Sequence, residues 1–199
     1  NKTRTVLIEN FADTEIDISN QANAYLESLR LTQIAETGFS DFTTLQYHID
    51  DSGEDPFYLA NTGDPSARSL FYGVSQAPSA VLGGNQFNGN PFNITELDID
   101  RRSLQDPSFE IVIDTLSSVV DVLSAAITVT SNITLTEQVN VQVVVIEKGI
   151  DYNGITYDNV VKKLMFEGQG RTLNVSWTPG TQTTVNAEWN IDVEVFDPS

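Results

Sequence analysis

The sequence predicts an α+β protein made of two domains. Before Asp106, strand-like segments alternate with segments whose apolar residues recur at helical spacing. After it, short runs with a period of two residues are separated by turns rich in Asn, Gly and Pro. This change of period places an α/β domain over residues 1–105 and an all-β domain over 106–199. A chain of 199 residues is long enough for two such cores.

The first domain begins with a strand, a helix and a second strand. A mostly apolar run over 5–11 predicts the first strand, and apolar residues every three to four positions over 19–36 predict a helix. The run over 42–50 predicts the second strand.

The best-marked helix follows, with Asp64 as its N-cap, Pro65 at the first helical position and Gly73 just past its end. Three further elements complete the domain: a strand over 79–82, a hairpin over 83–90 and a helix over 95–104. The order strand, helix, strand, helix, strand, strand, helix matches a thioredoxin-like layer of helices around a mixed sheet.

The second domain is predicted from strands alone. In the clearest one, over 185–195, apolar residues alternate with polar ones, as in a half-exposed antiparallel sheet. The other strands are predicted over 108–114, 122–130, 139–148, 157–166 and 173–178. Six or seven such strands predict a sandwich of immunoglobulin-like type.

Four stretches carry a family resemblance: Val6–Phe11, Phe71–Val81, Val143–Glu147 and Tyr157–Val161. In order and spacing they resemble the Omp28-related outer membrane proteins of Bacteroidetes, over most of the chain. The resemblance implies a thioredoxin-like domain joined to a β-sandwich, in a protein exported to the outer membrane, cell surface or periplasm. It also places a last strand beyond Ser199, and membrane anchoring, as in a lipoprotein, would come from a lipid upstream of Asn1.

Members of this family carry a Cys-x-x-Cys pair at the start of the first helix. Counted from Phe11, those positions fall on Ile16, Asp17, Ile18 and Ser19. The chain contains no cysteine, so this degenerate motif has no thiolate and thiol-disulfide exchange is impossible in this chain.

Pro78 stands where thioredoxin-like folds carry a cis-proline facing the active site. There the preceding residue, here Ala77, offers backbone groups to an extended peptide, so the resemblance implies a binding edge at Ala77 and Pro78. The alternative is a structural turn, because a cis-proline is also a common device of tight turns.

The net charge of −18 makes this a strongly acidic protein and disfavours nucleic acid and anionic membrane surfaces as partners.

One loop suggests calcium as a cofactor. It contains Asp50, Asp51, Glu54 and Asp55, which supply the oxygen ligands that calcium prefers, although without EF-hand spacing. The alternative is a solvated turn. No apolar run is long enough to predict a transmembrane segment.

His48 is the only histidine. On its strand it shares a face with Gln46 and Asp50, so a His–Asp pair is conceivable. No motif places a nucleophile beside it, and a packed or capped imidazole is the alternative.

These observations favour a non-catalytic exported or cell-surface interaction protein. Its unknown protein, peptide or glycan ligand would bind at the loops holding residues 16–19 and 77–78, or along a sheet edge. Two other hypotheses stay open: a relative of thiol-disulfide oxidoreductases whose cysteines were removed or whose activity is degenerate, and a calcium-linked adhesion module.

Overall fold

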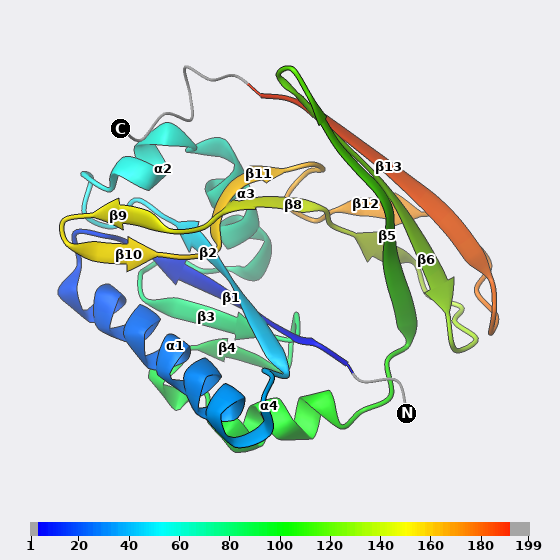
Figure 1. Ribbon diagram of the computed structural model, residues 1–199, viewed down its shortest axis with the longest axis horizontal. Coiled ribbons are helices and arrows are strands. Elements are labelled where there is room, and N and C mark those ends of the chain that lie inside the picture. Colours follow the sequence, from blue (N-terminus) through cyan, green and yellow to red (C-terminus); the bar gives the residue numbers. More distant parts are fainter. Residues whose placement is uncertain (1–3, 192–199) are drawn as a thin grey trace. The chain divides into compact units, whose positions relative to one another are not determined.

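The computed structural model describes residues 4–191 and divides the chain into two compact units (Figure 1). The first unit contains residues up to Asp106 together with 145–163, and the second contains 107–144 and the residues after 163. The predicted division gave all of 106–199 to the second domain. The structure differs because Ile150, Tyr157 and Val160 of the returning segment form a buried cluster with Phe57 of the first unit.

The first unit is built around a six-stranded mixed sheet. Its strands, in spatial order, are β4 (Phe87–Gly89), β3 (Ser79–Leu82), β1 (Val6–Ala12), β2 (Phe42–His48), β11 (Val160–Leu164) and β8 (Val144–Glu147). β1 and β2 are parallel, whereas β3 is antiparallel to β1 and β4 to β3. β11 pairs with β2 at one position, Val160 opposite Gln46. The parallel pair needs a crossover, which helix α1 (Asp17–Thr37) supplies.

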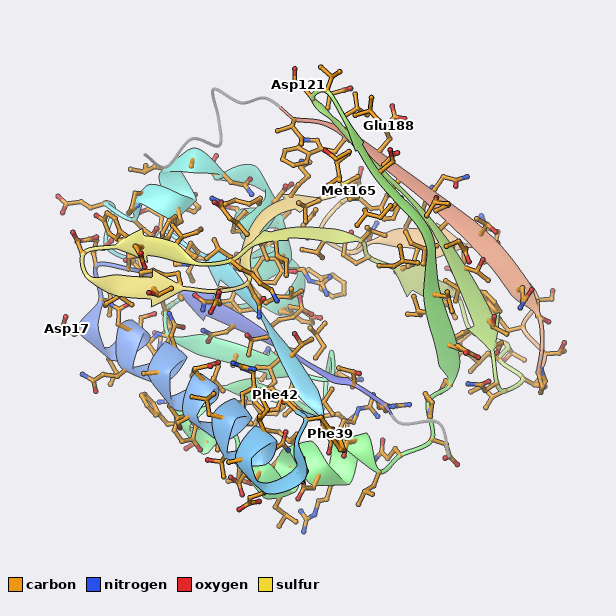
Figure 2. All side chains as sticks on the ribbon, viewed as in Figure 1. Asp17, Phe39, Phe42, Asp121, Met165 and Glu188 are labelled. Carbon is orange, nitrogen blue, oxygen red and sulfur yellow. The ribbon has the colours of Figure 1, made fainter. Side chains whose placement is uncertain are left out.

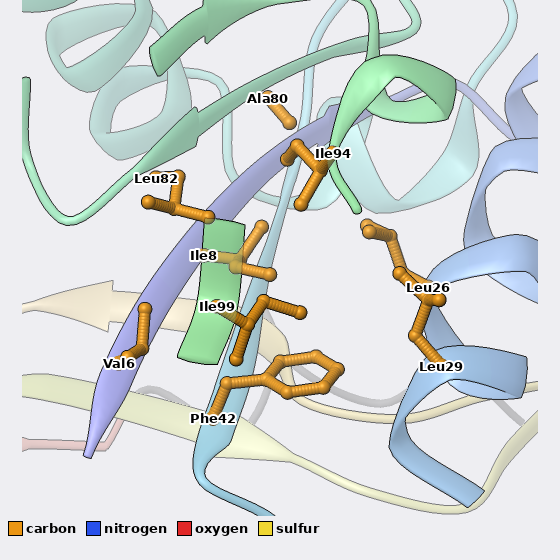
Figure 3. Packing of buried hydrophobic residues seen from close by; sticks show 9 residues of the cluster. All are labelled: Val6, Ile8, Leu26, Leu29, Phe42, Ala80, Leu82, Ile94 and Ile99. Atoms are coloured by element: carbon orange, nitrogen blue, oxygen red, sulfur yellow. The ribbon is translucent and has the colours of Figure 1, made fainter. Parts of the chain in front are cut away.

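The apolar core lies between this sheet and α1 (Figure 3). Val6 and Ile8 point to the same face of β1 because side chains alternate along a strand. Leu26 and Leu29 of α1 pack against them, and so does Phe42 at the start of β2. Figure 2 shows Asp17 and Phe39 at the two ends of α1.

Helix α4 (Glu96–Ser103) follows the short 3₁₀ helix η1 (Pro91–Asn93) and adds Ile99 to the same core. A capping box fixes its start, since the Thr95 side chain accepts from the Asp98 amide while the Asp98 carboxylate accepts from Thr95.

The other face of the sheet carries a buried ion pair. Glu9, next to Ile8 on β1, points away from the apolar core and is 1% exposed. Its carboxylate accepts hydrogen bonds from Nε and Nη2 of Arg68, at 2.6 and 2.7 Å, and from the hydroxyl of Tyr72, at 2.6 Å. Arg68 and Tyr72 both belong to α3 (Gly63–Tyr72), so this network fixes that helix on the sheet.

Helix α3 ends as predicted but begins differently. Gly73 has the left-handed backbone, with φ 68°, that glycine adopts readily after a helix. Asp64 was expected to be the N-cap; instead Thr62 holds that position, without a side-chain hydrogen bond. Asp64 lies in the first turn and pairs with Lys163 at 3.0 Å. A further helix, α2 (Pro56–Ala60), and a hairpin of β9 (Ile150–Tyr152) and β10 (Ile155–Tyr157) complete the unit.

The second unit contains two antiparallel sheets. One has the order β13 (Gln182–Asn190), β6 (Val122–Ser131) and β5 (Phe109–Val119), and the other pairs β7 (Val139–Val141) with β12 (Arg171–Leu173). The core of the unit comprises Ile127, Val129, Leu173, Trp177 and Val185. The predicted alternation holds where β13 is described, whereas residues after 191 lie outside the described part of the chain.

No helix of the described residues is long and apolar enough to cross a membrane.

Candidate functional site

Three loops meet at one end of the sheet of the first unit. Residues 13–19, which include the start of α1, follow β1; residues 49–55 follow β2, and 77–78 precede β3. Because β1 and β2 are parallel and β3 is antiparallel to β1, these loops lie at the same sheet end. We call them the loop cluster. They contain the predicted redox positions 16–19, the predicted binding edge at 77–78, here called the proline edge, and the acidic residues of 50–55, here called the acidic loop.

Asp13 joins the first two loops. It is fully buried, and its Oδ2 accepts from the amides of Ser52 at 2.7 Å and Asp51 at 3.2 Å. Its Oδ1 accepts from the Glu15 amide at 2.9 Å and the Ser52 hydroxyl at 3.0 Å. A buried carboxylate with four donors is a structural clamp. Sequence reasoning missed it, although a charged residue directly after the apolar end of a strand was a usable signal.

The predicted redox positions start helix α1. Ile16 is the N-cap residue, is half-buried and provides no side-chain cap, while Asp17 and Ile18 are exposed. Ser19 is fully buried, and its Oγ accepts the Asp13 amide at 2.9 Å. A hydrocarbon and a hydroxyl engaged by the backbone therefore stand at the positions where the family resemblance predicted thiols, and neither can form a thiolate.

The peptide bond between Ala77 and Pro78 is cis. The amide of Ala77 donates to Oδ2 of Asp51 at 3.1 Å. The backbone N–H that the proline edge was expected to present to a peptide is thus bound by a carboxylate of the same chain.

Asp55 joins the second loop to the first. It is fully buried, and its Oδ1 caps α2 by accepting from the amides of Phe57 at 2.8 Å and Tyr58 at 3.1 Å. Its Oδ2 accepts from the Thr14 amide at 2.7 Å and lies 2.8 Å from Nδ1 of His48. Burial acts to raise the pKa of Asp55, but the bonds from His48 and the backbone amides hold that pKa below its ordinary value.

His48 pairs with this carboxylate and not with Asp50, the partner that its strand position suggested, because Asp50 is exposed. The imidazole ring packs at 4.8 Å from the ring of Phe57 and 5.9 Å from that of Tyr157. In the described chain no hydrogen-bond partner reaches Nε2. A Ser–His–Asp relay needs a hydroxyl there, so the pair does not form a catalytic triad.

The four acidic residues proposed for calcium are not brought together as ligands. Asp55 points into the interior and Asp51 binds the Ala77 amide, while Asp50 and Glu54 are exposed. Within residues 4–191, no group of three or more His, Asp and Glu side chains is arranged to hold a metal ion. The loop uses its carboxylates to bind backbone amides, a role that the count of acidic residues does not reveal.

Comparison with known proteins gives a likeness of fold. No family model matches the chain, and no curated protein matches it. HBP35 of Porphyromonas gingivalis is similar in structure, with a TM-score of 0.66 and 13% identity, over 96% of this chain and 65% of that one. A protein of Agrobacterium tumefaciens is similar with a TM-score of 0.58 and 16% identity, over 94% of this chain and 79% of that one.

The chain thus spans slightly less than two thirds of HBP35. At 13% identity, this likeness is one of fold alone. The likeness extends over almost all of the chain, which is a mixed α/β protein with several sheets and few helices.

Proposed function

We propose that this chain is a non-catalytic interaction protein, built on a thioredoxin-like scaffold without redox thiols. The observation that carries the proposal is the state of the redox positions: Ile16 has no reactive group, and the buried Ser19 hydroxyl binds the Asp13 amide. Such a site supports the fold and offers no group for electron exchange.

The element order supports the scaffold. Parallel β1 and β2, antiparallel β3 and β4, α1 on one face of the sheet and α3 on the other are the arrangement expected of a thioredoxin-like domain. The hairpin of β9 and β10 would then be an addition to that domain. We assign the second unit to an immunoglobulin-like β-sandwich. On the family resemblance, we place the protein at the outer membrane, cell surface or periplasm.

Of the two binding routes considered, the sheet edge is favoured because Asp51 occupies the Ala77 amide. β5 is the outermost strand of its sheet, and Ile111, Ile113 and Leu116 on it are 62 to 67% exposed. An outer strand with exposed apolar side chains can pair with an extended segment of a partner protein.

An insulin-reduction assay with dithiothreitol tests the absence of redox activity. We expect the rate to equal that of dithiothreitol alone, with an intact Cys-x-x-Cys thioredoxin as the positive control. A rate above that background would overturn the proposal.

The double variant Ile16→Cys with Ser19→Cys tests the scaffold. If these positions correspond to a redox pair, the two cysteines form an intramolecular disulfide, seen as the loss of free thiols after mild oxidation. Two thiols that stay free would contradict the thioredoxin-like assignment of this loop.

A further inference from the structure

The first unit contains a pocket of about 510 Å³ that includes none of residues 16–19 and 77–78. It lies between α1, β2 and the segment that carries β10, and its volume is in the range of small-molecule sites. Five of the side chains that line it are amides: Asn10, Asn20, Asn23, Gln46 and Asn159.

Three of these amides form a chain of hydrogen bonds. Nδ2 of Asn10 donates to Oδ1 of Asn23 at 2.5 Å, and Nδ2 of Asn23 donates to Oε1 of Gln46 at 3.3 Å. β1, α1 and β2 each supply one member. The chain orients neutral groups that both donate and accept.

Two oxygens of the lining are buried without a partner. Oδ1 of Asn10, a residue only 1% exposed, accepts no hydrogen bond in the structure, and neither does Oδ1 of Asn159. The other amide atom of Asn159 donates to Oγ1 of Thr44 at 3.3 Å, which fixes its orientation. A buried acceptor without a donor is costly, so both positions favour a ligand that supplies O–H or N–H groups. Less than 1 Å² of either oxygen is accessible, so such a group reaches them only when the lining side chains shift.

The backbone of β2 adds one more donor and acceptor. The Val6 amide donates to the carbonyl of Asp41, and the Gln46 amide donates to the carbonyl of Asn159. Backbone groups alternate in direction along a strand, so the N–H and C=O of Thr44 point away from β1, on the side where β11 pairs only at Gln46. Thr44 also lines the pocket.

The charges around the pocket balance. Arg30 is bound at both Nε and Nη2 by the carboxylate of Glu27, at 2.7 and 2.6 Å. Lys148 and Asp158 are the other charged residues of the lining. In a chain of net charge −18, this neutral lining selects neither an anion nor a cation.

We propose that this pocket binds a neutral polyhydroxylated ligand, a mono- or disaccharide. Each sugar hydroxyl donates and accepts, which matches a lining of amides and hydroxyls with two vacant acceptors. A peptide is less suited because β2 offers the backbone of a single residue, Thr44, for strand pairing. This sugar site goes beyond the proposed function, which concerns the β5 edge of the second unit. Redox activity in the insulin assay would contradict that function and leave sugar binding to be measured separately.

The test is to titrate the chain with maltose, lactose and N-acetylglucosamine and to monitor binding by two-dimensional amide NMR. Glucuronate, glucosamine and trialanine serve as charged and peptide probes. We expect at least one neutral sugar to bind with a Kd of about 1 mM or tighter and to shift the amide signals of Asn23, Thr44 and Asn159.

Asn23→Leu removes the middle of the amide chain, and we expect it to weaken binding of that sugar about tenfold. Gln21→Leu is the matched control, on the exposed part of the same helix outside the pocket, and should bind as the unaltered chain does. Thr44→Val provides a second test from β2 should Asn23→Leu fail to fold. Binding of trialanine or of the charged probes alone, equal loss in the control, or no binding by any neutral sugar would overturn the proposal.

Discussion

Asp55 gives the sharpest prediction, because a single buried carboxylate holds two loops and a helix start. In Asp55→Ala the amides of Phe57 and Tyr58 lose their cap, which costs about 1 kcal/mol. The buried Thr14 amide and Nδ1 of His48 are left without an acceptor, at about 1–3 kcal/mol each. The total loss of unfolding free energy is about 3–7 kcal/mol.

Urea unfolding followed by circular dichroism at 222 nm is the assay, because α1 to α4 all lie in the first unit. Asp50→Ala is the matched control: Asp50 is exposed in the same loop, and its loss should change the free energy of unfolding by less than about 0.5 kcal/mol. Equal effects of the two variants would show that the buried hydrogen bonds of Asp55 do not stabilise the fold.

Comparing the unaltered chain with Asp55→Ala at different pH values gives a second test. Because the pKa of Asp55 is lower in the folded chain than its ordinary value of 3.8, its ionisation stabilises the fold above that pH. This contribution is lost as the pH falls through 3.8 and below the folded pKa. The stability gap between the unaltered chain and Asp55→Ala should therefore narrow below about pH 4. A gap that widens on acidification would contradict the assigned direction.

Three other predictions concern stability. Glu9→Gln removes the carboxylate that binds the buried Arg68 guanidinium. It should lower the free energy of unfolding by about 3–5 kcal/mol, measured by circular dichroism at 222 nm. A loss below about 1 kcal/mol would contradict a stabilising role of this buried ion pair. Gly170→Ala places a Cβ 2.6 Å from the Val141 carbonyl oxygen at φ 85°, whereas at Gly180 the φ is 87° and no atom lies within 4 Å. Gly170→Ala should therefore destabilise the second unit more than Gly180→Ala does, as measured by unfolding followed by tryptophan fluorescence. A larger effect of Gly180→Ala would contradict the close contact at Gly170. The melting temperature should be the same in calcium and in chelator, and a rise in calcium would restore the metal-site hypothesis.

Elements with strong local signals were predictable from the sequence. β3 has the predicted bounds, and α3 ends where Gly73 permits a left-handed residue. The membership of 145–163 was not predictable, because a period-two pattern marks a strand but not the sheet that it joins. Only the burial of Ile150 and Tyr157 against Phe57 decides it.

The site was only partly predictable for a related reason. The positions of Ile16, Ser19 and Pro78 followed from a family resemblance, yet the groups that occupy their polar atoms come from distant loops. Asp51 reaches the Ala77 amide across 26 positions, and Asp55 reaches the Thr14 amide across 41. Acidic residues look alike in a sequence, and only the fold distinguishes a solvated carboxylate from a buried clamp.

We propose that the loop cluster is a closed structural clamp. Amide hydrogen exchange of the intact chain measures this directly, residue by residue. The amides of Asp13, Thr14 and Ala77, which donate to side chains of Ser19, Asp55 and Asp51, should exchange as slowly as the amides of β1. Rapid exchange at all three would show that the loop cluster is open and does not act as a clamp.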